Sequence, residues 1–326
     1  MTNSKKMNQL HINPASSNWA GRKSEDVEYW HQAVIPVNNL EYDSDSKSKK
    51  IGILGYAGEE GVRRNRGRIG ASAGPEMIKK MLGPLAFHLP MGTKILDYGN
   101  IHTNGEDMES SHNLISEAVF NLLETHHFPV LFGGGHDLAF AHARGVYKYL
   151  ETKNEKLGII NLDAHFDLRP LVDGKGHSGS PFFQLAQEYP DNFHYLCMGV
   201  QRSSSPKSLF ETAKKLKVRS MLMEDFRLNN WEYIQEKILW FIDSVNKIYL
   251  SVDMDGFSSA YAPGVSAPSP MGFTPEIAFK VFELITKSKK MISMDVAEMN
   301  PTYDQDNATV RLAARCVEYI VRKTFE

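Results

Sequence analysis

Short apolar runs recur along the chain from residue 51 onward, and each has the length of a buried strand. Runs without polar alternation are typical of strands that are covered on both faces, as in a parallel sheet. Eight such runs predict eight strands. They span residues 51–55, 93–97, 129–132, 158–162, 194–199, 218–223, 248–253 and 291–296.

Amphipathic stretches of helical length separate most of these runs. Strand alternating with helix predicts an α/β fold with a mostly parallel sheet and helices on both faces, because right-handed crossovers place them there. In such a sheet the ligand site lies beyond the carboxyl ends of the strands. The clearest helical stretches are residues 75–85, 111–125, 138–150, 231–244 and 275–288.

Residues 1–48 follow neither pattern. They are polar, end in the run EYDSDSKSKK, and are predicted to form an irregular leader that is packed on the domain or partly mobile. From residue 49 to residue 326 there is no internal repeat and no second linker. We therefore predict an irregular leader over 1–48 and one catalytic domain over 49–326.

Three polar clusters directly follow or end predicted strands: GGGHD at residues 133–137, NLDAHFD at 161–167 and SVDMD at 251–255. Parallel strands end at one edge of a sheet, so the clusters are expected to meet there. One cluster alone could equally be a carboxylate that caps the next helix, or a core histidine. Three clusters favour a shared metal site. The candidate ligands are His136, Asp163, His165, Asp167, Asp253 and Asp255.

The ligand types indicate the chemistry. Carboxylates and imidazoles without thiolates favour hard or borderline divalent cations such as Mn²⁺, Zn²⁺, Fe²⁺ or Co²⁺. Four crowded aspartates would repel one another if left bare, and two divalent ions relieve that repulsion. A pair of metals can activate a water for attack on an electrophilic carbon or phosphorus. The expected reaction is a hydrolysis.

Composition narrows the partners. The chain has 326 residues and a formal net charge of -2, which gives no overall field for nucleic acid or an anionic membrane. A small-molecule substrate is therefore expected. No stretch approaches the roughly 20 apolar residues of a membrane span or resembles a secretory signal, so we expect a cytoplasmic protein. Cys197 and Cys316 lie in strand-like and helix-like runs and are expected to be reduced, buried thiols.

The order of the clusters, with DVAEMNP at residues 295–301, resembles the ureohydrolase family of arginases and agmatinases. The resemblance runs from about residue 50 to the end of the chain. It implies a three-layer α/β fold around an eight-stranded parallel sheet, and two Mn²⁺ ions that serve the hydrolysis of a guanidinium or amidinium carbon. It also implies a homo-oligomer, either a trimer or a hexamer.

Several local runs are similar to the formimidoylglutamase subgroup of this family, which hydrolyses N-formimidoyl-L-glutamate to glutamate and formamide in histidine degradation. Arginases and agmatinases usually have GGDHS at the first cluster, so Gly135 and Asp137 depart from their pattern. Their DP after the paired aspartates is also missing at residues 258–260. The runs that carry the similarity are EGVRRNRGRIGASAGP at 60–75, GGGHD, DAHFDLRP at 163–170, HSGSPFFQL at 177–185 and APGVSAP at 262–268.

Two alternatives remain open. The first is a hydrolase of a guanidino compound such as arginine, agmatine or guanidinobutyrate, which would release urea. The second is a catalytically silent family member that acts as a binding subunit. All six ligand positions hold ligating residues, which argues against the silent member.

The resemblance also implies roles for single residues. Asp167 would help to relay a proton to the departing amine. His177 resembles the family's mobile proton-shuttle histidine, although a solvated loop histidine would fit the flanking GKGHSGS as well. One manganese would be held by His136, Asp163, Asp167 and Asp253, and the other by Asp163, His165, Asp253 and Asp255.

The substrate makes two further demands. An amidinium is cationic and planar, so a carboxylate opposite the metals can hold it, and Glu298 is the candidate. Its alternative role is a carboxylate at a helix N-terminus. An acidic substrate tail needs cations at the mouth of the pocket, and Arg169 is placed there by its position after Asp167. Further candidates are Arg202 and Arg63, and Arg63 belongs to a run that also contains Arg64, Arg66 and Arg68. Such a run also suits a solvated or subunit-contact surface.

Overall fold

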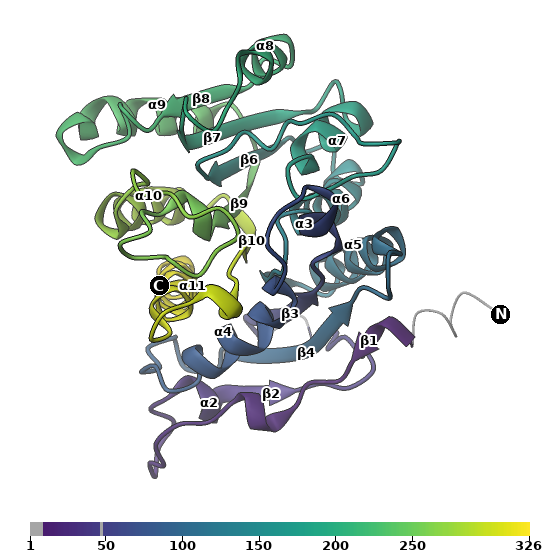
Figure 1. Cartoon of the computed structure of the whole chain (residues 1–326). Coiled ribbons are helices and arrows are strands. Elements are labelled where there is room, and N and C mark those ends of the chain that lie inside the picture. The colour runs from purple at the N-terminus through teal and green to yellow at the C-terminus, as the bar shows by residue number, and fades with distance from the viewer. Residues whose placement is uncertain (1–8, 46–47) are drawn as a thin grey trace.

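Residues 9–45 and 48–326 are described by the structure, a computed structural model. One ten-stranded sheet runs through the molecule in the order β1-β4-β3-β5-β10-β9-β6-β7-β8, with β2 also paired to β4 (Figure 1). Every pairing is parallel except that of β1 with β4. The strands are β1 His11–Ile12, β2 Val34–Pro36, β3 Lys50–Ala57, β4 Lys94–His102, β5 His127–Phe132, β6 Leu157–Leu162, β7 His194–Val200, β8 Arg219–Leu222, β9 Lys247–Asp253 and β10 Met291–Ala297.

The eight strands that the apolar runs predict are β3 to β10, and all eight are confirmed. Every residue of β5 and of β6 is buried, as expected for central strands that are covered on both faces. The five predicted helical stretches are also confirmed as α4, α5, α6, α9 and α10.

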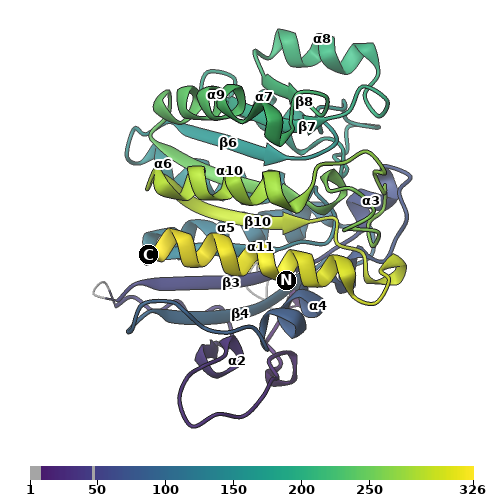
Figure 2. The ribbon, with the colours of Figure 1, turned by 90° about the vertical axis from the view of Figure 1, so that its left-hand side faces the viewer.

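Helices cover both faces of the sheet and complete three layers (Figure 2). One core cluster joins a face of the sheet to α4, α9, α10 and α11, and a second joins the other face to α5, α6, α7 and α8. The α-helices are α2 Trp30–Ala33, α3 Glu60–Arg64, α4 Gly74–Leu82, α5 Met108–Glu124, α6 Leu138–Glu151, α7 Pro181–Glu188, α8 Lys207–Lys215, α9 Trp231–Asp243, α10 Pro275–Lys287 and α11 Ala308–Phe325. Short 3-10 turns are η1 Ser16–Asn18, η2 Ala71–Ala73, η3 Leu228–Asn230, η4 Met254–Gly256 and η5 Pro301–Tyr303.

The leader is more regular than its sequence predicts. Its described part, residues 9–45, contains β1, η1, α2 and β2, and both strands pair with β4, so the sheet has ten strands instead of eight. Trp30 is 1% exposed, and the Trp19 Nε1 atom donates to Asp97 Oδ2 at 2.7 Å. These contacts with the domain order a segment that has no strong pattern of its own. Residues 1–8 and 46–47 of the predicted leader lie outside the described residues.

The four central strands β5, β10, β9 and β6 are neighbours and run in the same direction. Their carboxyl ends therefore deliver the three clusters, and the segment after β10, to one edge of the sheet. Cys197 and Cys316 are free and buried, as expected. Within the described residues, no helix is long and apolar enough to cross a membrane.

Candidate metal centre

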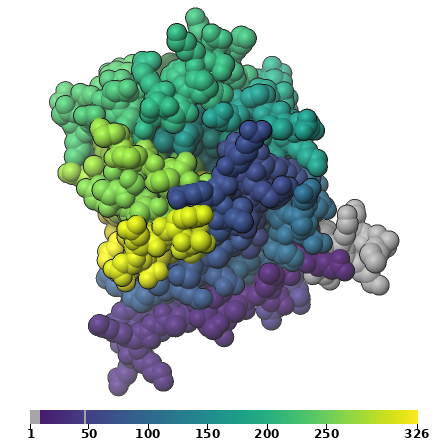
Figure 3. Space-filling model, viewed as in Figure 1, coloured from purple at the N-terminus to yellow at the C-terminus, as the bar shows by residue number. Residues whose placement is uncertain are grey.

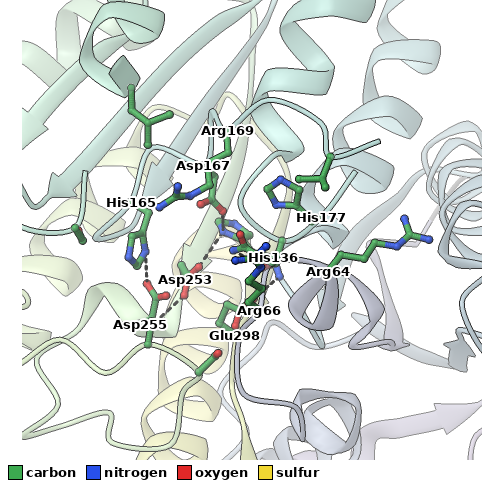
Figure 4. A pocket seen from close by; sticks show the side chains of 18 of the residues that line it. Arg64, Arg66, His136, His165, Asp167, Arg169, His177, Asp253, Asp255 and Glu298 are labelled. Carbon is green, nitrogen blue, oxygen red and sulfur yellow. Dashed lines mark hydrogen bonds and ion pairs between the residues drawn. The ribbon is translucent and has the colours of Figure 1, made fainter. Parts of the chain in front are cut away.

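The six predicted ligands meet at the carboxyl edge of the sheet (Figure 4). The first group surrounds His136, which follows β5. Its Nδ1 atom lies 2.9 Å from Asp167 Oδ2, 2.9 Å from Asp253 Oδ2 and 3.3 Å from Asp163 Oδ2. Ligand atoms of these four residues all lie within 4.8 Å of one another. This is the set predicted for one of the two metal ions.

The second group surrounds His165. The Nδ1 atom of His165 lies 3.3 Å from Asp163 Oδ1 and 3.3 Å from Asp255 Oδ1. Asp163 belongs to both groups and presents a different oxygen to each, as a bridging ligand would. Asp253, which we expected to bridge as well, falls in the first group only.

Hydrogen bonds around His136 suit it to a metal ion. Ser251 Oγ donates to Asp295 Oδ1 at 2.7 Å, so it accepts from His136 Nε2 at 2.9 Å. The proton of the neutral ring is thereby held on Nε2, and Nδ1 keeps a free lone pair that faces the carboxylates. Among the described residues, His136 Nδ1 and Asp255 Oδ1 are buried without a hydrogen-bond partner. These residues therefore fit divalent cations.

The pKa values of the aspartates at this site also favour bound divalent cations. Burial, together with the neighbouring Asp163 carboxylate, raises the pKa of Asp167 to about 6. Burial also raises the pKa of Asp253 well above its usual range, with a further contribution from Asp255. Burial opposes ionisation of Asp163 too, but its interactions with the His136 and His165 rings outweigh burial and lower its pKa. Bare, the site would retain protons that two divalent ions would displace.

Glu298 follows β10 and lies beside the first group. Its carboxylate Oε1 accepts a hydrogen bond from the backbone N–H of His136 at 2.8 Å, and the residue is 4% exposed. Burial, helped by the charge of Asp255, raises the pKa of Glu298 to about 8. The next helical turn is capped by Asn300, so Glu298 does not have the capping role that was its alternative.

Two residues beside the metal ligands have unusual backbone conformations. Asp167 and Glu298 both have left-handed backbones, with φ angles of 49° and 61°. Residues other than glycine, asparagine and aspartate rarely adopt this conformation, so the backbone of Glu298 is the more strained of the two, and such strain is often retained where a side chain must be aimed at a site. Both residues line the cavity beside the metal ligands.

His177 lies in the loop between β6 and α7, and it is 2% exposed. Its Nε2 atom donates to the Pro170 carbonyl at 3.1 Å, and its Nδ1 atom accepts from the Gly179 N–H at 3.2 Å. Burial lowers the pKa of the ring, which favours the neutral form. His177 lines the cavity, so it is not the solvated loop histidine that its flanking glycines also suggested.

A cavity of about 680 Å³ opens over the metal ligands. Figure 3 shows surface from the α3 region, from residues near 265 and from the segment after β10 meeting on one face of the molecule. Besides the metal ligands His136, His165, Asp167, Asp253 and Asp255, the walls include Arg64, Asn65, Arg66, Gly67, Arg68, Arg169, Pro170, Val172, His177, Ser178, Ser204, Pro206, Ser208, Leu209, Ser266, Ala267 and Glu298.

Two of the predicted substrate arginines do not lie in these walls. Arg63 points to the surface, where it pairs with Glu60 and Glu106. Arg202 lies 3.9 Å from Glu224 and is outside the cavity. Neither lines the cavity in this structure, because each has its carboxylate partner elsewhere, and their contact with a substrate stays a prediction.

The arginines that do line the cavity differ in their partners. Arg64 is held by Glu60 and Glu109. Arg68 donates to the carbonyls of Ser266 and Val265 and stacks on Tyr303. Arg66 and Arg169 are exposed and have no ion pair with any residue that the structure describes. The sequence favoured Arg169 and gave Arg66 no preference over Arg63, Arg64 and Arg68, since nothing local distinguishes Arg66 from its neighbours.

Comparisons with known proteins agree with the geometry. The arginase family profile matches residues 49–322. A formimidoylglutamase of Clostridium tetani is 38% identical over 308 residues, which cover 91% of each chain. A formimidoylglutamase of Geobacillus kaustophilus is 36% identical over 313 residues, which cover 94% of this chain and 96% of the relative.

Solved structures of formimidoylglutamases also resemble this chain. A Trypanosoma cruzi formiminoglutamase with Mn²⁺ superimposes with a TM-score of 0.76 and 26% identity, covering 87% of this chain and 96% of that one. A formimidoylglutamase of Bacillus subtilis has a TM-score of 0.79 and 22% identity, covering 93% and 94%, and shows the shared fold. The three-layer fold, the clusters of aspartate and histidine side chains and these relatives lead to one conclusion: the chain belongs to the arginase family.

Proposed function

We propose that this chain hydrolyses N-formimidoyl-L-glutamate to L-glutamate and formamide with two Mn²⁺ ions per chain. One observation carries the proposal: a single cavity joins a two-metal ligand set and the buried Glu298 carboxylate to Arg66 and Arg169, two cations that have no ion pair with the described residues. The names of the formimidoylglutamases similar to this chain support the same substrate, and the Mn²⁺ of the Trypanosoma cruzi protein supports the metal.

The reacting end of the substrate would lie between the metal ligands and Glu298. When bound by the six ligands, two divalent cations supply Lewis-acid activation of the attacking water. Glu298 would accept hydrogen bonds from the planar, cationic amidinium. Its Oε1 is already oriented by the His136 N–H, so this carboxylate is held in place before substrate arrives.

Cleavage breaks the bond between the formimidoyl carbon and the glutamate nitrogen, and that nitrogen must gain a proton as it leaves. Asp167 and His177 are the proposed proton-transfer groups, because both line the cavity. In its neutral form His177 carries its proton on Nε2, where the Pro170 carbonyl holds it. Release of that contact would free the N–H to face the departing amine.

The far end of the substrate carries two carboxylates. Arg66 and Arg169 would hold them, since a guanidinium binds a carboxylate through paired charge-assisted hydrogen bonds. Agmatine ends in an amine instead, which these two cations would repel. The arginines therefore favour the formimidoyl substrate over that guanidino alternative.

The test is a substrate panel with the manganese-loaded protein. Release of equimolar glutamate and formamide from formimidoylglutamate is the expected result. Urea released from arginine, agmatine or guanidinobutyrate would replace the proposal with the guanidino alternative. Two bound ions without turnover of any compound would favour the silent binding subunit.

We also propose a cytoplasmic location and a homo-oligomer, either a trimer or a hexamer. Both rest on the sequence and on the family resemblance. Size-exclusion chromatography with light scattering tests the assembly.

A further inference from the structure

The second arginine of the EGVRR helix α3 differs sharply from the first. Both share the Glu60 carboxylate, since Arg63 Nε donates to it at 2.6 Å and Arg64 Nε at 2.8 Å. The Arg63 side chain is 52% exposed, whereas that of Arg64 is 8% exposed. Two adjacent, chemically identical side chains therefore occupy different surroundings.

Arg64 uses the rest of its guanidinium to join separate segments. Nη1 and Nη2 donate to the Glu109 carboxylate at 2.6 and 3.2 Å. Nη2 also donates to the Glu106 carbonyl at 2.7 Å, and Nη1 donates to the Gly176 carbonyl at 3.1 Å. In Figure 4 the Arg64 guanidinium points away from Glu298 and His136. Its donors are engaged, so Arg64 is poorly placed to bind a substrate carboxylate.

The Gly176 carbonyl immediately precedes His177, and α3 holds the following residue as well. The N–H of Ser178 donates to the Gly61 carbonyl at 3.0 Å, and Asn65 Nδ2 donates to Ser178 Oγ at 3.1 Å. Three successive contacts from α3 and its end thus support the loop that carries His177.

The helix α3 is itself fixed against the metal centre. A Cβ atom on Gly61 would lie 2.1 Å from Asp137 Oδ1, so only glycine permits this approach. Asp137 directly follows the ligand His136, and its Oδ2 accepts from Tyr56 Oη at 2.7 Å. Asp137, which stands in GGGHD where the arginase pattern GGDHS has a serine, therefore supplies a carboxylate against which α3 packs.

We propose that Arg64 is a positioning residue for His177: by holding the Gly176 carbonyl, it fixes the loop backbone from which the imidazole lines the cavity. The inference rests on the proposed function, in which His177 transfers a proton. Arg64 touches neither the substrate nor the metals in this role. Its five donors span Glu60, Glu109 and two carbonyls, and a lysine ammonium at the same position cannot reach all of them.

The test compares Arg64→Lys with its matched control Arg63→Lys, because both keep the charge of the same helix. For Arg64→Lys we expect kcat on formimidoylglutamate to fall about 10- to 100-fold, as for a displaced catalytic group. KM and bound manganese should stay close to wild type, and the thermal midpoint should fall by only a few degrees, because lysine keeps the charge beside Glu60 and Glu109. Hydrogen exchange should become faster at the amides of residues 176–180. Arg63→Lys should leave all of these unchanged.

A second variant separates the contact from general damage. Glu109→Gln weakens the paired hydrogen bonds between the Arg64 guanidinium and residue 109. The Glu109 side chain is 53% exposed, so the fold should tolerate the change. The kcat loss of the double variant Arg64→Lys with Glu109→Gln should be smaller than the product of the single losses, since both break one contact.

The outcomes remain distinguishable. If the wild type does not turn over formimidoylglutamate, the proposed function fails, and the exchange measurement still tests the loop. Unchanged exchange at residues 176–180 in Arg64→Lys would overturn the inference. So would a kcat loss that is explained by loss of metal or by unfolding at the assay temperature, or losses that multiply in the double variant.

Discussion

The Glu298 carboxylate accepts a hydrogen bond from the backbone N–H of His136 at 2.8 Å, which joins the proposed amidinium acceptor to the loop of a metal ligand. Glu298 thus has one oxygen engaged by the protein before any substrate binds. Its second oxygen remains for a cation in the cavity, and such a cation would favour the ionised carboxylate although burial raises its pKa to about 8. This contact makes Glu298 a sensitive test of the proposed chemistry.

Replacing Glu298 with glutamine keeps the size of the side chain and can keep the bond to the His136 N–H. It removes the charge that the amidinium would meet, and a charge-assisted hydrogen bond contributes about 1.5 to 3 kcal/mol. We expect kcat/KM to fall by roughly 10- to 100-fold. Steady-state kinetics measure this, and metal analysis should still find two ions. Undiminished kcat/KM would remove Glu298 from the amidinium site.

Arg66 and Arg169 should act on the substrate tail alone. Arg66→Ala or Arg169→Ala is expected to raise KM for formimidoylglutamate about tenfold or more, through loss of a charge-assisted carboxylate bond. Hydrolysis of a simple formamidine without carboxylates should change little. Arg202→Ala is the control, since Arg202 is outside the cavity. An equal loss on both substrates would place the arginines elsewhere in the mechanism.

The central sheet and the metal cluster could be predicted because the signal for each is local. Uninterrupted apolar runs identify the buried strands, and the polar clusters directly follow or end strands that lie side by side. The leader carries no such signal. The strand β1 has two residues and β2 has three, and both depend on pairing with β4 and on contacts such as Trp19 with Asp97.

The roles of the arginines could not be predicted, because partners distant in the sequence decide them. Arg64 is held by Glu109, which is 45 residues away, and Arg68 binds Ser266, which is 198 residues away. Arg66 lies between them and has no ion-pair partner among the described residues. Four arginines within six positions look alike until the fold gives each its own surroundings.

A buried ion pair offers a test of stability. Lys79 and Asp97 are both fully buried, 2.7 Å apart, and Asp97 also accepts from Trp19 of the leader. Lys79→Met would leave the Asp97 carboxylate buried without its cation, which costs about 3 to 5 kcal/mol. The matched control is Lys94→Met, whose side chain is 39% exposed and pairs with Asp43. For Lys94→Met, urea unfolding should find a loss in the free energy of unfolding below about 1 kcal/mol.

Comparable losses in Lys79→Met and Lys94→Met would contradict this assignment. Limited proteolysis adds a second measurement, because Asp97 anchors Trp19. Lys79→Met should expose the leader to cleavage sooner than Lys94→Met does.

His127 should make stability depend on pH. It is buried between Tyr98 and Thr125, each 2.9 Å from a ring nitrogen. Burial, with a contribution from the charge of Lys50, lowers its pKa to about 4. The unfolded chain takes up this proton near pH 6.5, whereas the folded chain does not until about pH 4. Stability is therefore complete above the unfolded pKa and declines as pH falls between these values.

The expected decline from His127 between pH 6.5 and pH 5 is roughly 2 kcal/mol in the free energy of unfolding. Urea titrations at several pH values measure it. His127→Asn should unfold more easily at every pH, since it loses both ring contacts, but with a shallower slope against pH. His126→Asn is the control, because His126 is exposed and has a left-handed backbone that asparagine tolerates. Equal slopes for wild type and His127→Asn would show that another group carries the dependence.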